Sequence, residues 1–193
     1  MTRILLVRHA TSAWNAEGRW QGQADPPLSE TGRAEARSAA TPLRDSVGAV
    51  VASDLERAFE TATILASELD LDPPAPEPGL REIDVGEWSG LTRGEIEERW
   101  PGLLEEWRAG RLDRIPGGEE RDRFRARVLE SLERVASHGR TDLLVVTHAG
   151  VIGVLERHLG VHPGTSVPRL AGRWFEVAET ISAGAERVHL LPA

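Results

Sequence analysis

Cysteine, tyrosine and lysine are all missing from this 193-residue sequence. Without cysteine the chain can form no disulfide and offers no thiolate ligand to a metal, which is typical of a protein from a reducing cytoplasm. Without lysine, all 23 basic residues are arginine. Any side-chain cation that binds an anion here is therefore a guanidinium group, whose planar fork suits phosphate.

Long apolar runs and an excess of positive charge are also missing. No segment approaches the roughly 20 apolar residues of a membrane-spanning helix. The N-terminal apolar run covers only residues 4–7, which is too short for the core of a signal peptide. The net charge is −8 at pH 7, whereas nucleic-acid-binding proteins usually carry a basic surplus. We therefore expect a cytoplasmic protein that binds neither membranes nor nucleic acids.

The order of apolar runs and amphipathic segments predicts an α/β fold in a single domain, residues 1–193. Short apolar strands that alternate with helices are typical of a mostly parallel sheet covered on both faces, which is a three-layer α/β/α sandwich. Residues 72–78 contain four prolines and are expected to be irregular or extended. The expected strands are 4–7, 47–52, 143–146, 174–177 and 187–190, and the expected helices are 29–44, 55–69, 92–107 with a break at Pro101-Gly102, 119–137 and 150–159.

Three polar side chains follow the predicted strands at the same end. His9 comes directly after the first strand, His148 follows the strand at 143–146, and Arg57 lies in the first turn of the helix after the strand at 47–52. Ligands of open α/β sheets bind beyond the carboxyl ends of the strands. We therefore expect these three side chains to meet at one edge of the sheet.

These residue types suit phosphoryl transfer, which needs positioning and stabilisation of charge on the phosphoryl oxygens. A neutral imidazole can form a covalent intermediate, so His9 is the candidate nucleophile. Arg8 and Arg57 could bind the oxygens through paired hydrogen bonds, and His148 could donate another. Glu82 could protonate the leaving group. Each residue taken alone is more often structural than functional, so the hypothesis depends on their combination.

No histidine and carboxylate spacing in the sequence is typical of a metal site. His158 and His162 are four residues apart, but Gly160 and Pro163 argue against an ordered helix between them. We expect no cofactor and no metal. The histidines assigned to the surface or to packing are His138, His158, His162 and His189.

Local sequence motifs make a functional role of the candidate residues more probable than each residue does alone. The blocks around the candidate residues occur in the same order as in the histidine phosphatase superfamily, also called the phosphoglycerate mutase-like family, which this sequence resembles over nearly its whole length. One block would be weak evidence, whereas six in order are strong evidence. The matching blocks are 6–15, 20–32, 52–62, 80–90, 116–119 and 144–152.

The resemblance implies a role for each candidate residue. His9 corresponds to the phosphorylated histidine, and Glu82 corresponds to the proton donor. Arg8, Arg57 and His148 correspond to the phosphate pocket. The family uses no metal. Further phosphate or substrate contacts are implied for Asn15, Gln21, Gly22 and Ala149.

Three residues depart from the family pattern, and one of them, Thr11, stands where an acidic residue or glutamine is common. Ala10 and Ala149 stand where glycine is frequent. If residue 10 required a positive φ, its methyl group would strain the turn beside the nucleophile. We expect both alanines to be tolerated.

The resemblance includes both phosphatases and mutases. Mutases of this family are longer, with an insertion after the glutamate block, a tyrosine where this chain has Val85, and an extended tail. Here 100–116 is short and the chain ends soon after a predicted strand. We therefore expect hydrolysis of a small phosphorylated metabolite, with mutase-type transfer as the alternative. A non-catalytic phosphate-binding regulatory domain is a third possibility, although such a domain would not need Glu82.

Overall fold

The computed structural model describes residues 1–137, 139 and 141–191, so His138 lies outside the described residues. Within them, six strands form one sheet in the order β3-β2-β4-β1-β5-β6. Strands β3, β2, β4 and β1 are parallel, β5 pairs antiparallel with β1, and β6 pairs antiparallel with β5. The strands are β1 (Thr2–Arg8), β2 (Ala49–Ala52), β3 (Ala75–Pro76), β4 (Leu143–Thr147), β5 (Ala171–Val177) and β6 (Ile181–His189).

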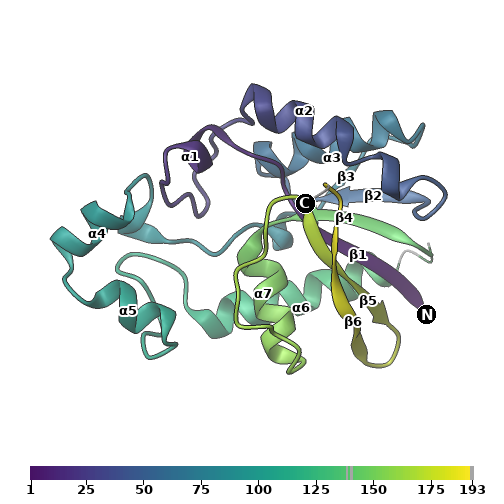
Figure 1. The fold of residues 1–193 in the computed structure, drawn as a ribbon. Coiled ribbons are helices and arrows are strands. Elements are labelled where there is room, and N and C mark those ends of the chain that lie inside the picture. The colour runs from purple at the N-terminus through teal and green to yellow at the C-terminus, as the bar shows by residue number, and fades with distance from the viewer. Residues whose placement is uncertain (138, 140, 192–193) are drawn as a thin grey trace.

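Helices cover both faces of this sheet, as Figure 1 shows. Helices α2 and α3 lie on one face, and α6 and α7 lie on the other. The predicted fold class, a single α/β domain of three layers around a mostly parallel sheet, is thereby confirmed. The helices are α1 (Ala13–Ala16), α2 (Glu30–Ser38), α3 (Glu56–Glu68), α4 (Arg93–Arg99), α5 (Leu103–Arg108), α6 (Arg121–Ser137) and α7 (Ala149–His158).

The central strands are apolar throughout because both of their faces are buried. In β1, Ile4 and Leu6 pack in the cluster that includes α6 and α7. Leu5 and Val7 pack in the cluster that includes α2 and α3. Successive side chains of a strand point to opposite faces, so one four-residue run serves both halves of the core.

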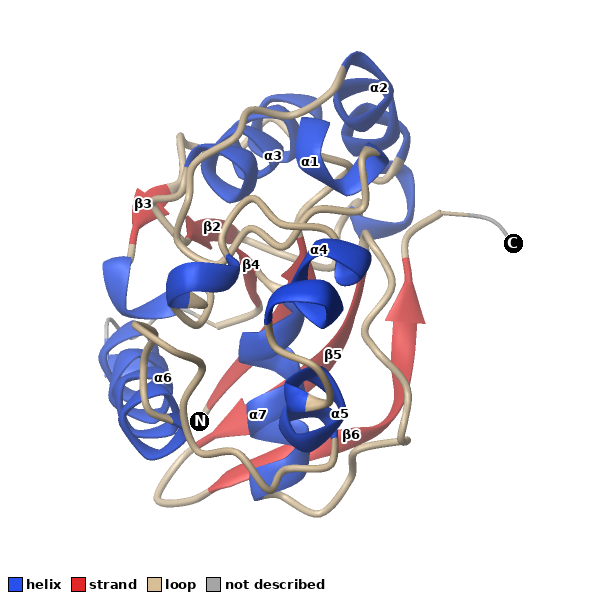
Figure 2. Ribbon diagram, turned by 90° about the vertical axis from the view of Figure 1, so that its left-hand side faces the viewer, coloured by secondary structure: helices blue, strands red, loops and turns tan. Residues whose placement is uncertain are grey.

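Helices α4 and α5 lie beyond the carboxyl ends of the parallel strands, as Figures 1 and 2 show. The break between them falls at the predicted place, where Gly102 has a φ of +80°. Within the described residues, none of the helices combines the length and the apolar character needed to cross a membrane.

Some predicted boundaries were wrong. The helix expected at 29–44 ends at Ser38, and a short 3-10 turn at Thr41–Leu43 follows. Pro42 explains this, because proline lacks an N–H and disfavours helical geometry in the residue before it. The strand expected at 187–190 begins at Ile181. Its first half is exposed and only weakly apolar, so it lacks the pattern of a buried strand.

Two short elements had no sequence signal. Helix α1 is a single turn, which a capping box between Ser12 and Asn15 stabilises. Strand β3 lies at the sheet edge within the proline-rich segment, where Pro76 pairs with Ala52. Proline is tolerated on an edge strand because no further strand needs its missing N–H.

Candidate active site

The two predicted histidines lie side by side at the carboxyl edge of the sheet. The β1–β4 register pairs Arg8 with Thr147, and the backbone N–H of His9 donates to the carbonyl of Thr147 at 2.9 Å. The rings of His9 and His148 follow directly, with centroids 5.3 Å apart and planes inclined at 62°. Parallel pairing of two strands therefore brings together side chains that are far apart in the sequence.

The ring of His9 has one protonated and one unprotonated nitrogen. The ring is 3% exposed, and its Nδ1 lies 2.7 Å from the carbonyl oxygen of Ala10. A carbonyl only accepts hydrogen bonds, so Nδ1 carries the proton and Nε2 keeps its lone pair. Burial, followed by the charges of Arg57 and Arg8, holds the pKa of His9 well below its ordinary value. The ring is therefore neutral.

Arg57 is fully buried beside that nitrogen. Its Nε lies 3.3 Å from His9 Nε2. Its terminal nitrogens donate to the carbonyls of Gly22 at 2.7 Å and Ala24 at 2.8 Å. Burial lowers the pKa of Arg57 to about 10, so the guanidinium stays charged at neutral pH. The loop at 21–24 thus fixes a cation against the nucleophile.

The loop can approach Arg57 so closely because Gly22 has a φ of +53° and lies against Val85. A Cβ at this position would fall 2.6 Å from Val85 Cγ2, which no side chain tolerates. The resemblance implied that Gly22 contacts phosphate or substrate. Gly22 lines the cavity, and its carbonyl accepts a hydrogen bond from Arg57.

Arg8 and His148 each hold a buried nitrogen without a hydrogen-bond partner among the described residues. Arg8 Nη1 donates to the carbonyl of Val167 at 2.7 Å, which leaves Nε unpaired. His148 Nε2 contacts Ser53 Oγ at 2.9 Å, and Nδ1 is unpaired. Unpaired buried polar groups are rare and costly, so both positions suit an anion. Burial, then Arg57, keeps the pKa of His148 well below its ordinary value.

Asn15 and Gln21 line the same cavity as His9. The side-chain oxygen of Asn15 accepts from the backbone N–H and the hydroxyl of Ser12, at 3.2 and 3.1 Å. The side-chain oxygen of Gln21 is 2.8 Å from the same hydroxyl. The carbonyl oxygens are therefore committed to the loop, and the amide nitrogens are the groups left for a ligand.

Glu82 reaches the cavity from the loop after β3. Its two carboxylate oxygens accept from the backbone N–H groups of Ile83 at 2.9 Å and Gly150 at 3.0 Å. A Cβ on Gly150 would lie 2.1 Å from the carboxylate, so a side chain there would displace the carboxylate from its present position. Sequence reasoning assigned no role to Gly150, although it lies within the matching block 144–152.

A second layer holds the backbone of Glu82 in place. Arg127 donates to the carbonyl of Glu82 at 2.8 Å and to the carbonyls of Gly79 and Arg81. The other side of its guanidinium binds both carboxylate oxygens of Glu119. Sequence reasoning missed Arg127, whose only signal is its place on the predicted helix at 119–137.

Ala10 and Ala149, the two alanines that depart from the family pattern, cause no backbone strain. Neither belongs to the residues with positive φ, so neither position demands glycine for its conformation. Ala10 is fully buried, and Ala149 begins α7 and lines the cavity. The methyl groups therefore fit at both positions.

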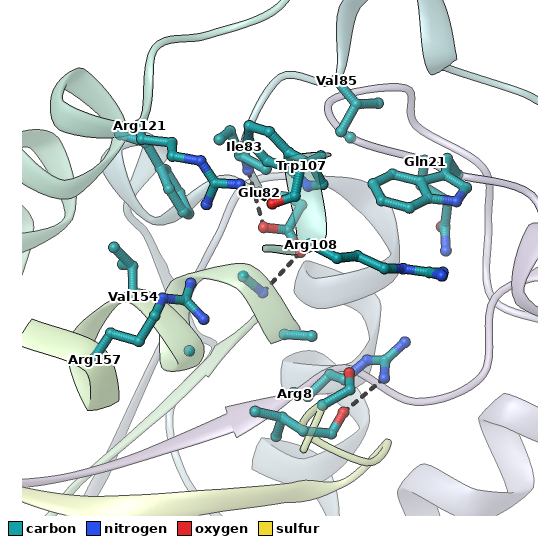
Figure 3. Close-up of a pocket in the computed structure, with 18 of the residues that line it drawn as sticks. Arg8, Gln21, Glu82, Ile83, Val85, Trp107, Arg108, Arg121, Val154 and Arg157 are labelled. Atoms are coloured by element: carbon teal, nitrogen blue, oxygen red, sulfur yellow. Dashed lines mark hydrogen bonds between the residues drawn. The ribbon is translucent and has the colours of Figure 1, made fainter. Parts of the chain in front are cut away.

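The candidate residues open into one cavity of about 980 Å³ between the sheet edge and α4 to α7 (Figure 3). His148 is not on its wall and lies behind His9. His158 and His162, which the sequence placed on the surface or in packing, also line the wall. Besides Arg8 and Arg57, the lining arginines in the described part of the chain are Arg19, Arg93, Arg108, Arg121, Arg125 and Arg157.

Metal ligands are not gathered anywhere in the described ranges 1–137, 139 and 141–191. These residues contain no group of three histidine, aspartate or glutamate side chains that could hold an ion.

Comparison with known proteins identifies the family. The profile of the histidine phosphatase superfamily (branch 1) matches residues 4–180. A bifunctional protein of Mycobacterium tuberculosis is 35% identical over 98% of this chain, which spans only 53% of that protein. The metal-independent phosphoserine phosphatase of Arabidopsis thaliana is 37% identical, over 79% of this chain and 66% of that protein.

Solved structures with a similar fold support the same family. A mycobacterial glucosyl-3-phosphoglycerate phosphatase in complex with VO3 superimposes with a TM-score of 0.79 at 31% identity, covering 91% of both chains. The fold, the arrangement at the sheet edge and the family profile all lead to the same assignment. The chain belongs to the histidine phosphatase superfamily.

Proposed function

We propose that this protein hydrolyses small phosphomonoesters through a phosphohistidine on His9. The observation that carries the proposal is the state of this ring, which is neutral and oriented, with its unprotonated Nε2 accepting a hydrogen bond from the guanidinium of Arg57. A neutral imidazole beside a fixed cation can attack phosphorus while the charge on the phosphoryl oxygens is stabilised.

The reaction follows in two balanced steps. His9 Nε2 attacks phosphorus, the phosphorus–nitrogen bond forms, and the bond to the leaving oxygen breaks as Glu82 gives that oxygen its proton. The Glu82 carboxylate then takes a proton from water. The water oxygen attacks phosphorus, the phosphorus–nitrogen bond breaks, and inorganic phosphate leaves. Arg8 and Arg57 supply the positive charge for both steps, and the neutral ring of His148 supplies a hydrogen bond.

Hydrolysis is favoured over mutase-type transfer. The relatives include proteins named phosphoserine phosphatase and glucosyl-3-phosphoglycerate phosphatase. Val85, at the position where mutases have a tyrosine, packs on Gly22 and offers no polar group to a second substrate. The placement of Glu82 supports catalysis over phosphate binding alone, since a simple binding domain needs no carboxylate in an arginine-rich cavity.

Rapid quench with a ³²P-labelled ester tests the proposal. We expect base-stable, acid-labile phosphate on the protein, and none on His9→Ala. His189→Ala is the matched control because His189 is exposed on β6, and it should label like the wild type. Turnover should survive excess EDTA. Unchanged labelling of His9→Ala, or loss of activity in EDTA that Mg²⁺ restores, would contradict the mechanism.

A further inference from the structure

The amide between Ala10 and Thr11 links the ring of His9 to helix α2. Its carbonyl oxygen, on Ala10, accepts the Nδ1–H of His9 at 2.7 Å. Its N–H, on Thr11, donates to the carboxylate oxygen Oε2 of Glu35 at 3.1 Å. Because both groups belong to one amide, two hydrogen bonds in series connect the Glu35 carboxylate to the imidazole. We call this chain of groups the relay.

The amide of the relay is held in place by two helices. The hydroxyl of Thr11 donates to the same oxygen of Glu35 at 2.7 Å. The carbonyl of Thr11 accepts from the backbone N–H and the hydroxyl of Ser29, which caps α2, at 2.9 and 3.0 Å. On the other side, the N–H of Ala10 donates to the hydroxyl of Thr61 on α3 at 3.2 Å. Contacts with α2 and α3 therefore fix the orientation of the amide.

The charge of Glu35 is available to this amide alone. Within the part of the chain that the structure describes, Glu35 forms no ion pair, and both of its hydrogen bonds come from Thr11. Nearby, Glu60 of α3 is instead bound to Arg33. Glu35 is half-buried, so salt and water screen its charge less than that of an exposed carboxylate.

An anionic acceptor strengthens both hydrogen bonds of the relay. A carboxylate that accepts the N–H polarises the amide and makes its carbonyl a stronger acceptor, since hydrogen bonds in a chain reinforce one another. The carbonyl then holds the proton on Nδ1 of His9 and raises the electron density at Nε2, as the aspartate of a catalytic triad does for its histidine. When Nε2 bonds to phosphorus the ring becomes cationic, and the relay stabilises that charge.

The relay opposes the positive charges that surround the ring. Burial is the largest cause that lowers the pKa of His9, followed by the charges of Arg57 on α3 and Arg8 on β1. The hydrogen bond to the amide carbonyl raises this pKa, and Arg169, before β5, lowers it further. The ring of His148, which lies against that of His9, is itself neutral. The amide carbonyl thus favours the cationic ring that the arginines disfavour.

We propose that Glu35 is a positioning residue for the nucleophile, which acts through the Ala10–Thr11 amide to orient His9 and to stabilise the positive charge of its phosphorylated ring. This inference rests on the proposed function, because it requires a phosphohistidine on His9. The relay has opposite effects on the two steps. A more basic nitrogen attacks phosphorus faster, and it leaves phosphorus more slowly when water attacks.

Single-turnover rapid quench with a ³²P-labelled ester measures the two steps separately. Glu35→Gln keeps the size of the side chain and an acceptor oxygen for Thr11 but removes the charge. The rate constant for formation of the phosphoenzyme should fall about three- to tenfold, as expected when a charge-assisted hydrogen bond becomes neutral. The rate constant for its hydrolysis should not fall. The labelled fraction of the protein in the steady state should therefore decrease.

Two further variants separate the charge of Glu35 from its structural contact. Glu35→Ala removes the acceptor, so the amide can turn and both steps should slow. Glu30→Gln removes one negative charge from an exposed position on the same helix, and it should keep both wild-type rate constants. Thermal melts show whether each variant is folded.

A spectroscopic measurement tests the relay without turnover. In protein labelled with ¹⁵N-histidine, the Nδ1 proton of His9 moves upfield when its hydrogen bond weakens. Glu35→Gln should move this resonance upfield, and Glu30→Gln should leave it in place. An unmoved resonance in Glu35→Gln would show that the carboxylate does not act through the amide.

The outcomes separate the two proposals. Wild-type rate constants in Glu35→Gln, or an equal slowing of both steps in this variant, overturn the relay while the phosphatase assignment stands. If the wild type hydrolyses phosphomonoesters without label on His9, or does not hydrolyse them, the proposed function fails and the relay fails with it.

Discussion

At the scale of single residues, the state of His9 results from two effects. Sequence reasoning predicts that neighbouring arginines disfavour the imidazolium, and Arg57 and Arg8 do lower the pKa of His9. Burial is the larger cause, and only the folded structure reveals it. Both effects favour the neutral ring, so the nucleophile is available on the acid side of neutrality.

We expect kcat to fall on the acid side of its pH profile. The rate should fall as the pH drops through the pKa of His9, which lies below the ordinary value of about 6.5, because the imidazolium has no lone pair for attack. Steady-state kcat measured as a function of pH checks this expectation. A loss of activity already at the ordinary value would contradict it.

Esters with different leaving groups test whether Glu82 is the proton donor. Glu82→Gln should lower kcat for an alkyl phosphate by about 10²-fold or more, because the alkoxide needs a proton. For p-nitrophenyl phosphate, whose leaving anion is already stable, the loss should stay below about tenfold. Equal losses on both esters would exclude Glu82 as the proton donor and would direct attention to Asp84 or Glu87.

We expect that substituting Arg57 lowers kcat/KM as much as removing a typical hydrogen-bond donor to a developing anion does. Arg57→Ala should cost about 10²-fold or more in kcat/KM. Arg57→Lys should restore only part of it, because an ammonium cannot replace the planar fork that contacts Gly22 and Ala24.

Arg37→Ala is the control for Arg57, since Arg37 is exposed on α2. Thermal melts should be recorded alongside, because Arg57 is fully buried. A folded Arg57→Ala protein with wild-type kinetics would show that the phosphate pocket is wrongly assigned.

At the scale of elements, α7 is held at both ends. In its first turn, the backbone N–H of Gly150 donates to the carboxylate of Glu82. Near its other end, Glu156 is fully buried and binds Arg173 of β5 and Arg187 of β6 at 2.9 Å. The antiparallel hairpin thus anchors the helix whose first turn follows His148.

Removing this anchor should destabilise the fold. Glu156→Gln should lower the free energy of unfolding by about 3–5 kcal/mol, because it leaves two largely buried guanidinium groups without their counter-charge. Urea denaturation measures the loss. Glu176→Gln, an exposed position on β5, should change stability by less than about 0.5 kcal/mol.

The stability difference between the wild type and Glu156→Gln should depend on pH. Burial raises the pKa of Glu156, but the hydrogen bonds and charges of Arg187 and Arg173 outweigh it, so the net shift is downward. A depressed pKa stabilises the fold above the unfolded value of about 4.3. The difference between wild type and Glu156→Gln should therefore shrink as the pH falls below that value. If the difference in the free energy of unfolding does not change with pH, Glu156→Gln acts through altered packing and not through the loss of its charge.

At the scale of the whole molecule, charge is unevenly distributed. The chain carries a net charge of −8, yet among the described residues eight arginines and only three carboxylates line the cavity. A cleft lined by one sign of charge raises the local concentration of counter-ions and steers them inward. This protein can thus attract an anionic substrate although its surface as a whole repels anions.

Sequence patterns alone predicted the fold class and gathered the candidate residues. Apolar runs at 4–7 and 143–146 indicate strands that are buried on both faces, and polar residues after such strands meet at one edge. The family resemblance then assigned roles to His9 and Glu82. The inference of the fold class succeeds because hydrophobic periodicity and strand order are local properties that the chain displays directly, whereas the roles of His9 and Glu82 stay predictions.

Tertiary structure alone decided the contacts between loops. The carbonyl of Gly22 on Arg57 and the N–H of Gly150 on Glu82 both join segments that have no common pattern in the sequence. Backbone groups carry no residue-specific signal, and an arginine's partner depends on which loop packs against it. The amino-acid sequence thus determined which groups are available for phosphoryl chemistry, and packing decided which of them face the substrate.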